Sequence, residues 1–337
     1  MRMKLRTTLS LTASLFALVP PVGAQEQPAG EIAMIAEQGV EVLDQHLTAD
    51  GRLADLLDHP AFAGFAEWLL PWAGRRYDPA MPLRQIGGLL PYHTAVDTGT
   101  VVAALNRMID DASAGQTVFY DIYSEAERRA DPAKAATGLF FYRGRPGAPF
   151  AVIAPGGGFS YVGSVHEGFP YAEAISDLGL NAFVLTYRAG QGGQVATADL
   201  AVAITWIFRN AEELGVGTDG YSLWGSSAGA RMAAYIGSHG PAAFGGADLP
   251  KPAAVVMAYT SHSDLAGTEP PTFVVVGERD GIAPPANMER RIAALRRIGT
   301  PVEYHLFPNV GHGFGAGTGT SAEGWIAEAV RFWRQQL

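Results

Sequence analysis

The segment Gly225-Ser226-Ser227-Ala228-Gly229 has the residue types and spacing that can turn a serine into a nucleophile. It reads Gly-x-Ser-x-Gly and stands between a short apolar run and a run of small residues with helical character. A serine in such a strand-to-helix turn adopts a strained backbone, and glycines two positions before and after it let the chain fold back. Only Ser227 has glycine at both positions, because Ser226 has Trp224 and Ala228 there. Ser227 is therefore the candidate nucleophile.

A serine nucleophile needs a base and a group that orients the base. His312, between two glycines, follows the last β-like run, and Asp280 follows the seventh. The order Ser, Asp, His along the chain is that of α/β-hydrolases, and it differs from the orders in chymotrypsin and subtilisin folds. Asp264, after the sixth run, is an alternative partner for His312. We favour Asp280 because of its position after the seventh run.

A glycine-rich segment, Pro155-Gly156-Gly157-Gly158-Phe159, follows the third β-like run and could supply oxyanion donors. Because glycines let backbone N–H groups approach a ligand oxygen, we expect the amides of Gly157, Gly158 and Ala228 to form the oxyanion hole. Phe159 and His262 are candidate substrate contacts. The histidines show no close metal-ligand spacing such as His-Glu-x-x-His, and a serine triad works unaided, so we expect no metal and no cofactor.

The elements that must position these residues are eight β-like runs that alternate with helical runs after residue 115. This alternation predicts an α/β fold, an eight-stranded and mostly parallel sheet with helices on both faces. The first two runs lack a helical crossover and predict an antiparallel entry. Two continuously apolar runs should be central strands that flank the strand leading to Ser227. The eight predicted strands are residues 118–123, 138–142, 150–154, 182–187, 221–225, 253–259, 272–276 and 302–307.

Residues 25–115 differ in pattern, since their apolar side chains recur at helical spacing and no strand is evident. Prolines divide the segment into short helices, and its aromatic cluster of Phe62, Phe65, Trp68 and Trp72 is typical of a core. Because no Ser/Gly linker separates this extension from the catalytic domain at 116–337, we expect the two to pack together. We favour a cap over the active site as its role, with the cover of a sheet flank as the alternative.

Residues 1–24 have the pattern of a cleavable secretory signal. Arg2, Lys4 and Arg6 precede a short apolar run that ends in Val22-Gly23-Ala24. Cleavage after Ala24 would give a periplasmic or secreted protein. The signal holds three of the 24 basic residues and no acidic one, so 21 basic residues would remain against 33 acidic ones, a net charge of −12. This charge argues against nucleic acid as a partner.

The absence of cysteine excludes disulfides and a lipid-modified cysteine. No run after the signal reaches the roughly 18 apolar residues of a membrane-spanning helix, so we expect no membrane anchor. The oligomeric state is left open.

Three segments carry a family resemblance: residues 155–159, His166-Glu167-Gly168-x-Pro170, and residues 182–188. Together they resemble bacterial α/β-hydrolases related to acetylxylan and feruloyl esterases, over about residues 138–337. The resemblance implies hydrolysis of small acyl esters, often on plant-polysaccharide fragments, with Ser227, Asp280 and His312 as the triad. It also implies a small-molecule or oligosaccharide ester as the partner. Pro155 stands where hormone-sensitive-lipase-like relatives carry histidine, which disfavours that branch.

Other interpretations remain open at this point. A peptidase, an amidase or a polyester hydrolase could use the same triad, and a binding protein could be built on the same scaffold. We interpret Glu167 as structural, either in a capping box with Ser164 or in an ion pair with Arg188. His93, His166 and His262 are interpreted as surface or packing histidines, with His262 the one that could line the cleft.

Overall fold

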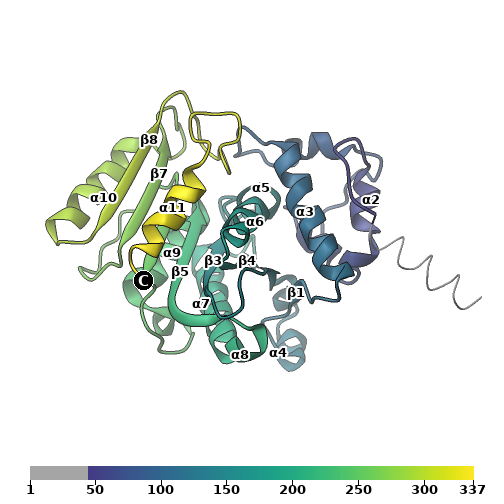
Figure 1. Cartoon of the computed structure of the whole chain (residues 1–337), viewed down its shortest axis with the longest axis horizontal. Coiled ribbons are helices and arrows are strands. Elements are labelled where there is room, and N and C mark those ends of the chain that lie inside the picture. Colours follow the sequence, from purple (N-terminus) through teal and green to yellow (C-terminus); the bar gives the residue numbers. More distant parts are fainter. Residues whose placement is uncertain (1–44) are drawn as a thin grey trace, which may run out of the picture. The chain divides into compact units, whose positions relative to one another are not determined.

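A computed structural model describes residues 45–337, all of which belong to one compact unit. Eight strands form a single sheet in the order β1-β2-β4-β3-β5-β6-β7-β8 (Figure 1). The pairs β1–β2 and β2–β4 are antiparallel, and all others are parallel. The strands are β1 (Phe119–Tyr120), β2 (Gly138–Tyr142), β3 (Pro149–Ala154), β4 (Asn181–Thr186), β5 (Gly217–Ser226), β6 (Ala254–Ala258), β7 (Thr272–Gly277) and β8 (Val302–Phe307).

The central strands have the composition that their position requires. β3 and β6 are almost wholly apolar and buried, and they flank β5, the strand that leads to Ser227, as the sequence predicted. The predicted fold class, the eight strands and the antiparallel entry are therefore confirmed. β1 is shorter than expected, although the carbonyl of Val118 still accepts a hydrogen bond from Phe141 of β2.

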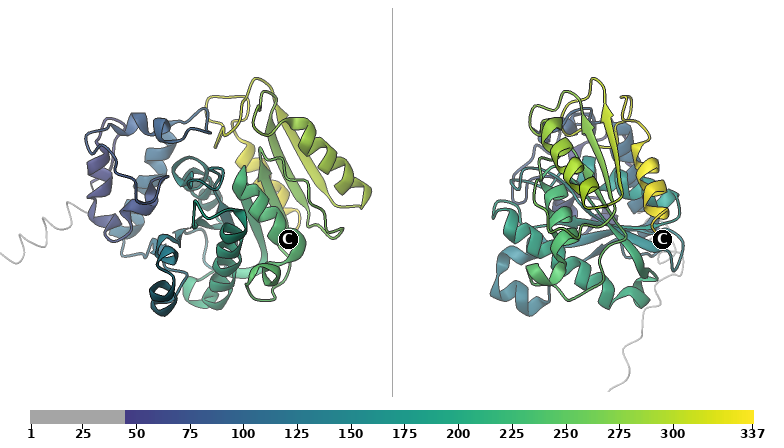
Figure 2. Two further views of the ribbon diagram at one scale, coloured as in Figure 1. Left: turned by 180° about the vertical axis from the view of Figure 1, so that it is seen from behind. Right: turned by 90° about the vertical axis from the view of Figure 1, so that its left-hand side faces the viewer.

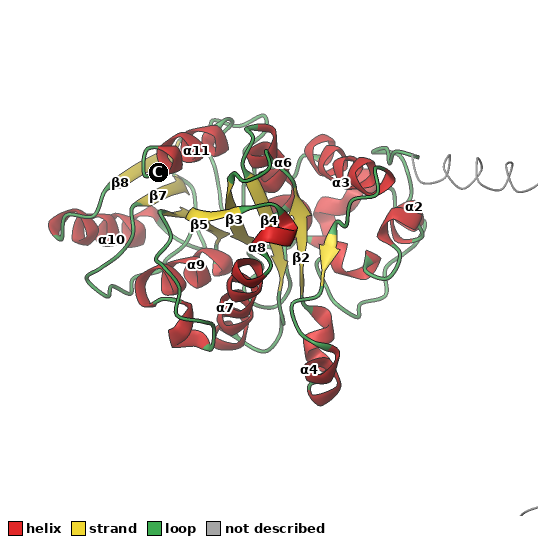
Figure 3. Cartoon of the chain, turned by 60° about the horizontal axis from the view of Figure 1, so that its bottom comes forward, coloured by secondary structure: helices red, strands yellow, loops and turns green. Residues whose placement is uncertain are grey.

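Helices cover both faces of the sheet (Figure 3). On one face lie α7 (Gly193–Arg209), α9 (Ala228–His239) and α10 (Pro285–Arg297), whose apolar side chains join one buried cluster. On the other lie α6 (Phe169–Asp177) and α11 (Trp325–Arg334), which share a second cluster with the extension. Figure 2 shows these layers from two further sides. The shorter helices are α4 (Glu125–Ala130), α5 (Ser164–Glu167), α8 (Ala211–Leu214), η4 (Pro132–Ala136) and η5 (Pro241–Phe244).

The described part of the extension contains less α-helix than its apolar periodicity predicts. Its elements are α2 (Leu53–Leu57), η1 (Pro60–Phe62), η2 (Ala66–Leu69), η3 (Leu83–Leu89) and α3 (Thr98–Ser113). Prolines recur through residues 60–91, and each removes a backbone donor, so short 3₁₀ turns replace longer helices there. Between residues 45 and 115 the only β-pairing is an isolated bridge of Arg52 with Pro82. The predicted helix around Ile32 and Leu43 lies outside the described residues, as does the predicted signal.

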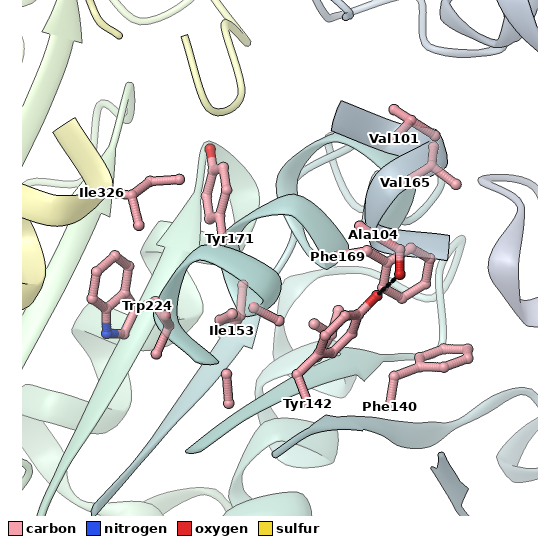
Figure 4. Close-up of a cluster of buried hydrophobic side chains, with 14 of the residues drawn as sticks. Val101, Ala104, Phe140, Tyr142, Ile153, Val165, Phe169, Tyr171, Trp224 and Ile326 are labelled. Carbon is pink, nitrogen blue, oxygen red and sulfur yellow. Dashed lines mark hydrogen bonds between the residues drawn. The ribbon is translucent and has the colours of Figure 1, made fainter. Parts of the chain in front are cut away.

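The extension covers a flank of the sheet. Helix α3 begins at Thr98 because the side chain of Asp97 accepts a hydrogen bond from the amide of Thr100. Its buried stripe packs on α6 and on β2, and the hydroxyl of Tyr142 donates to the carbonyl of Ala104 over 2.9 Å (Figure 4). The expected packing of the extension on the catalytic domain is therefore observed. No helix within residues 45–337 is long and apolar enough to cross a membrane.

Candidate active site

Ser227 stands at the turn between β5 and α9, with a positive φ of 49°. Its amide donates to the carbonyl of Ala258 at the end of β6, over 2.8 Å, which fixes the turn to the neighbouring strand. The turn requires glycine at position 229, because a side chain there would collide with the carbonyl of Ala154 in β3. A left-handed backbone at a non-glycine residue costs on the order of 1–3 kcal/mol and is typical of a functional position.

The side chains of Ser227, His312 and Asp280 form one hydrogen-bonded chain. His312 Nε2 lies 3.0 Å from Ser227 Oγ, and His312 Nδ1 lies 2.8 Å from Asp280 Oδ2. The Asp280 carboxylate is buried, and its Oδ1 accepts hydrogen bonds from the amides of Ile282 at 2.9 Å and Ala283 at 2.7 Å. These donors orient the carboxylate, which holds the Nδ1–H tautomer of His312. The arrangement leaves Nε2 free to accept the serine proton.

The alternative residues considered from the sequence lie elsewhere. Asp264 accepts a hydrogen bond from His239 Nε2 over 2.7 Å, and both side chains are largely exposed. Ser226 is fully buried, and its hydroxyl lies 3.1 Å from the hydroxyl of Tyr171. Neither side chain contacts His312, so the structure brings Asp280 and Ser227 to this histidine and leaves their rivals apart.

A cavity of about 200 Å³ opens beside Ser227 and His312. Of the predicted oxyanion donors, Gly158 and Ala228 line it and Gly157 does not. Phe159, predicted to contact substrate, also lines it. His262 does not, because its ring is buried against Tyr235 with centroids 4.7 Å apart. The remaining lining residues are Arg231, Thr260, Ser261, Ile282 and Ala283.

The cavity takes no lining residue from the described part of the extension, 45–115, which therefore does not wall it as the favoured cap would. The extension instead contacts the loops that carry the site. The amide of Thr94 donates to the carbonyl of Gly313 over 3.0 Å, and its hydroxyl donates to the carbonyl of His312 over 2.7 Å. A side chain at position 158 would touch the ring of Tyr92. The extension thus covers a flank of the sheet and contacts the loops that carry Gly158 and His312 through residues 92–94.

Glu167 has different partners from those predicted. It is fully buried, and its Oε1 forms an ion pair with His93 Nε2 over 2.9 Å. The hydroxyl of Ser164 is buried without a hydrogen-bond partner, and Arg188 binds Asp199 and Asp131 instead. Both proposed pairings of Glu167 were therefore wrong. His93 is far away in sequence and carries no motif, so no local spacing could have identified it.

The surroundings of Glu167 keep it ionised. Burial alone would raise the pKa of Glu167, but the ion pair and hydrogen bond with His93 and a hydrogen bond from Tyr259 outweigh burial, and the pKa falls to about 2. Burial, followed by the neighbouring charge of His93, lowers the pKa of His166 to about 4. His166 is thus neutral near pH 7, and its Nε2 donates to the carbonyl of Gly313 over 2.9 Å.

Tyr259 is a further residue that the sequence did not single out. It follows β6, has a positive φ of 36°, and packs edge-to-face on the ring of His312 with centroids 5.2 Å apart. Its hydroxyl donates to Glu167 Oε1 over 2.7 Å. A strained bulky residue in contact with His312 is a signal that only the three-dimensional structure provides.

One group of side chains within residues 45–337 has the composition of a cation site that the sequence did not predict. Glu303, His305 and Glu328 bring their ligand atoms within 4.8 Å of one another. His305 uses both ring nitrogens on the two carboxylates, and Arg331 also pairs with Glu303 over 2.6 Å. None of these residues lines the cavity beside Ser227.

The strand order, the nucleophile turn after β5 and the positions of Asp280 and His312 after β7 and β8 define the α/β-hydrolase fold. Among solved structures, an acetyl ester-xyloside bifunctional hydrolase from Caldicellulosiruptor lactoaceticus matches 64% of this chain and 95% of its own, at 21% identity and a TM-score of 0.55. An α/β-hydrolase from a deep-sea metagenome library matches 59% of this chain and 92% of its own, at 22% identity and a TM-score of 0.51. These likenesses establish the fold.

The sequence comparisons agree with the fold. The profile of the prolyl oligopeptidase family matches residues 255–337. Esterase LipQ of Mycobacterium tuberculosis is 26% identical over 228 residues, which cover 54% of each chain. An acetylxylan esterase of Xylanibacter ruminicola is 22% identical over 219 residues, covering 56% of this chain and 45% of that protein. The chain has the α/β-hydrolase fold and is similar in sequence to these bacterial esterases, and it spans about half the length of the curated relatives it matches.

Proposed function

We propose that this protein is a serine hydrolase that cleaves small carboxylic esters through an acyl-enzyme. The hydrogen-bonded chain from Ser227 through His312 to Asp280 is the observation that carries the proposal. All three groups are held by backbone contacts of their own, and the serine opens on a cavity. A non-catalytic binding protein would have no need to preserve this alignment.

In the proposed mechanism His312 Nε2 accepts the proton of Ser227 Oγ as the oxygen attacks the ester carbonyl. The negative charge that develops on the carbonyl oxygen is stabilised by backbone N–H groups of the glycine loop and of Ala228, which begins α9. His312 then donates the proton to the departing alcohol, and the acyl group stays on Ser227. Water, deprotonated by His312, releases the acid by the reverse sequence. Asp280 stabilises the imidazolium in both halves of the reaction.

We infer that the substrate is a small acyl ester whose carbonyl enters the cavity of about 200 Å³ beside Ser227. The names of two similar proteins, an acetylxylan esterase and an acetyl ester-xyloside hydrolase, support an acetyl ester on a plant-polysaccharide fragment as the substrate. A chain-length series of 4-nitrophenyl esters tests this proposal, with Ser227→Ala as the baseline. We expect kcat/KM to be highest for acetate and to fall as the chain lengthens. Equal rates from acetate to octanoate would contradict the inferred acyl size.

A peptidase is the second candidate, favoured by the match of residues 255–337 to the prolyl oligopeptidase family. The same triad cleaves both ester and amide bonds, so the leaving group decides between the two. A peptide 4-nitroanilide tested beside a 4-nitrophenyl ester of the same acyl group separates the candidates. We expect turnover of the ester alone. Comparable kcat/KM for the anilide would favour the peptidase.

A fluorophosphonate probe tests catalytic competence without any knowledge of the substrate. We expect it to label wild-type protein at Ser227 and to leave Ser227→Ala unlabelled, because only an activated serine reacts. Absence of labelling in folded wild-type protein would favour a binding role on a hydrolase scaffold.

Export is a further part of the proposal. The basic and apolar pattern of residues 1–24 supports a cleavable signal that directs the protein to the periplasm or the medium. The intact mass of protein recovered from cell fractions measures this directly. A mature chain that begins at Gln25 in the exported fraction would agree, and an uncleaved cytoplasmic chain would not.

A further inference from the structure

The Glu167 carboxylate lies at the centre of a buried polar network behind the glycine loop. Its Oε2 accepts a hydrogen bond from the amide of Gly156 over 2.6 Å. Its Oε1 accepts from the hydroxyl of Tyr259 over 2.7 Å and from His93 Nε2 over 2.9 Å. The side chains of Glu167 and His93 are almost fully buried. An ionised carboxylate survives such burial only when donors of this number and charge surround it.

Each of the three donors belongs to a different part of the active site. Gly156 begins the glycine loop, two residues before Gly158, which lines the cavity. Tyr259 directly follows Ala258, whose carbonyl holds the amide of Ser227. His93 belongs to the extension, which is otherwise packed on the sheet flank. The Glu167 carboxylate therefore connects the glycine loop, the segment after β6 and the extension by direct hydrogen bonds.

Residues 92–94 of the extension also form hydrogen bonds with the segment after the glycine loop and with the His312 loop. His93 Nδ1 lies 2.9 Å from the hydroxyl of Tyr161, which follows the glycine loop and accepts the amide of Tyr92 over 3.2 Å. Thr94, the next residue, binds the carbonyls of His312 and Gly313. These contacts place His93 between the loop that supplies the oxyanion donors and the loop that supplies the base.

We propose that His93 and Glu167 are positioning residues, which hold the glycine loop and the His312 loop at the separation that the transition state requires. Through residues 92–94, the N-terminal extension then helps to position the active-site loops, although it does not line the cavity. The inference rests on the proposed serine hydrolase function. Neither residue touches the reacting atoms, because no side chain of the pair lines the cavity beside Ser227.

The kinetic consequence follows from which interactions the pair controls. The oxyanion donors and the Nε2 of His312 interact with charge and protons that change in the transition state, so their displacement lowers kcat more than it raises KM. A displacement of about 1 Å can lower the rate about 100-fold. A role in stability alone would instead reduce the amount of folded enzyme and leave the kcat of the folded fraction unchanged.

His93→Ala tests the proposal, with His59→Ala as the matched control. His59 is a buried histidine of the same extension whose ring nitrogens bind the carbonyl of Gln45 and the amide of Ala61. It has no contact with the glycine loop or the His312 loop. Both variants lose a buried imidazole and its two hydrogen bonds, but His93→Ala also leaves the buried Glu167 carboxylate without its ion-pair partner. It should therefore lose more stability in urea unfolding than His59→Ala, and kcat is compared per mole of folded enzyme.

The measurements are kcat and KM for a chromogenic acetyl ester, per mole of folded and fluorophosphonate-reactive enzyme, and the inhibition constant of a boronic acid that forms a tetrahedral adduct. For His93→Ala we expect kcat to fall 10- to 100-fold, KM to change less than three-fold, and boronate binding to weaken as much as kcat/KM falls. His59→Ala should keep wild-type kcat. Equal kcat for His93→Ala and wild type, or equal losses in the two variants, would overturn the proposal.

Glu167→Gln keeps the test decisive if His93→Ala folds poorly, because glutamine preserves the volume and one acceptor for Gly156. The double variant Glu167→Gln/His93→Ala removes both members of the pair, so its loss of kcat should be well below the product of the two single losses. If the kcat loss of the double variant equals the product of the two single losses, the two residues act separately, and the proposed role of the pair is refuted. Wild-type turnover no greater than that of Ser227→Ala would instead refute the hydrolase function itself, and the inference with it.

Discussion

Replacing Asp280 with asparagine tests how the triad selects its tautomer. Oδ1 of Asp280 accepts two backbone hydrogen bonds, from Ile282 at 2.9 Å and Ala283 at 2.7 Å, while Oδ2 faces His312 Nδ1 at 2.8 Å. In Asp280→Asn the amide oxygen must stay on the two N–H donors, because the NH₂ group would otherwise oppose them. Turning it round would forfeit two buried hydrogen bonds, each worth on the order of 1 kcal/mol or more.

The NH₂ group of the variant therefore points at His312 Nδ1, which must accept, and the ring proton moves to Nε2. That proton then faces Ser227 Oγ, so the base is lost although the geometry is kept. We expect kcat for a 4-nitrophenyl ester to fall by about 10⁴, which corresponds to about 5 kcal/mol of activation free energy. The control is Asp264→Asn, the same change in a carboxylate that binds the largely exposed His239, and it should keep most activity. A folded Asp280→Asn enzyme within ten-fold of wild type would refute this reasoning.

Three further predictions follow from individual contacts. Ser227→Ala should lower kcat by about 10⁴ or more, whereas Ser226→Ala removes only a buried hydroxyl that contacts Tyr171 and should cost about 1 kcal/mol of stability; ester assays and urea unfolding measure both, and reversed activities would reassign the nucleophile. Because burial lowers the pKa of His166 to about 4, the unfolded chain binds a proton below pH 6.5 that the folded chain excludes, so His166 should lower the unfolding free energy by about 3 kcal/mol between pH 6.5 and 4. The fall in unfolding free energy over this range should be smaller by that amount in His166→Asn, and equal falls in variant and wild type would be evidence against a neutral buried imidazole. Removal of residues 1–115 should yield insoluble protein, because it uncovers apolar side chains on α6 and β2, and soluble monomer in size-exclusion chromatography would be the contrary result.

The fold could be predicted from the sequence wherever one strand or one turn carries its own signal. Continuous apolar runs fixed β3 and β6 to within a residue, and the spacing of glycines around Ser227 distinguished it from Ser226. These features are local, because sterics and burial act on consecutive residues. The same holds for His312 and Asp280, whose position after a strand places them at the edge of the sheet where the nucleophile lies.

The partners of Glu167 could not be predicted, because they depend on which distant segments pack together. His93 lies 74 positions before Glu167, in a segment whose local pattern shows only that it is apolar and rich in proline. For His262 the sequence predicted a contact with substrate that the structure does not show. Its neighbourhood in sequence suggested the cleft, but the ring turns inward against Tyr235, and burial followed by the charge of Arg291 lowers its pKa to about 3. The contacts of residues 92–94 with the glycine loop and the His312 loop are likewise long-range, so no local pattern could indicate them.

Two buried histidine–carboxylate pairs meet in this site, and the second nitrogen of each histidine determines what the pair can do. In the His312–Asp280 pair that nitrogen faces Ser227 Oγ, a hydroxyl that opens on a cavity where an ester can take up the negative charge. In the His93–Glu167 pair it faces the hydroxyl of Tyr161, and burial raises the pKa of this phenol well above its usual value, so the phenol keeps its proton. The His93–Glu167 pair therefore has no neighbouring group that could exchange a proton with a substrate. The first pair can perform general base catalysis, whereas the second can only hold the loops around it.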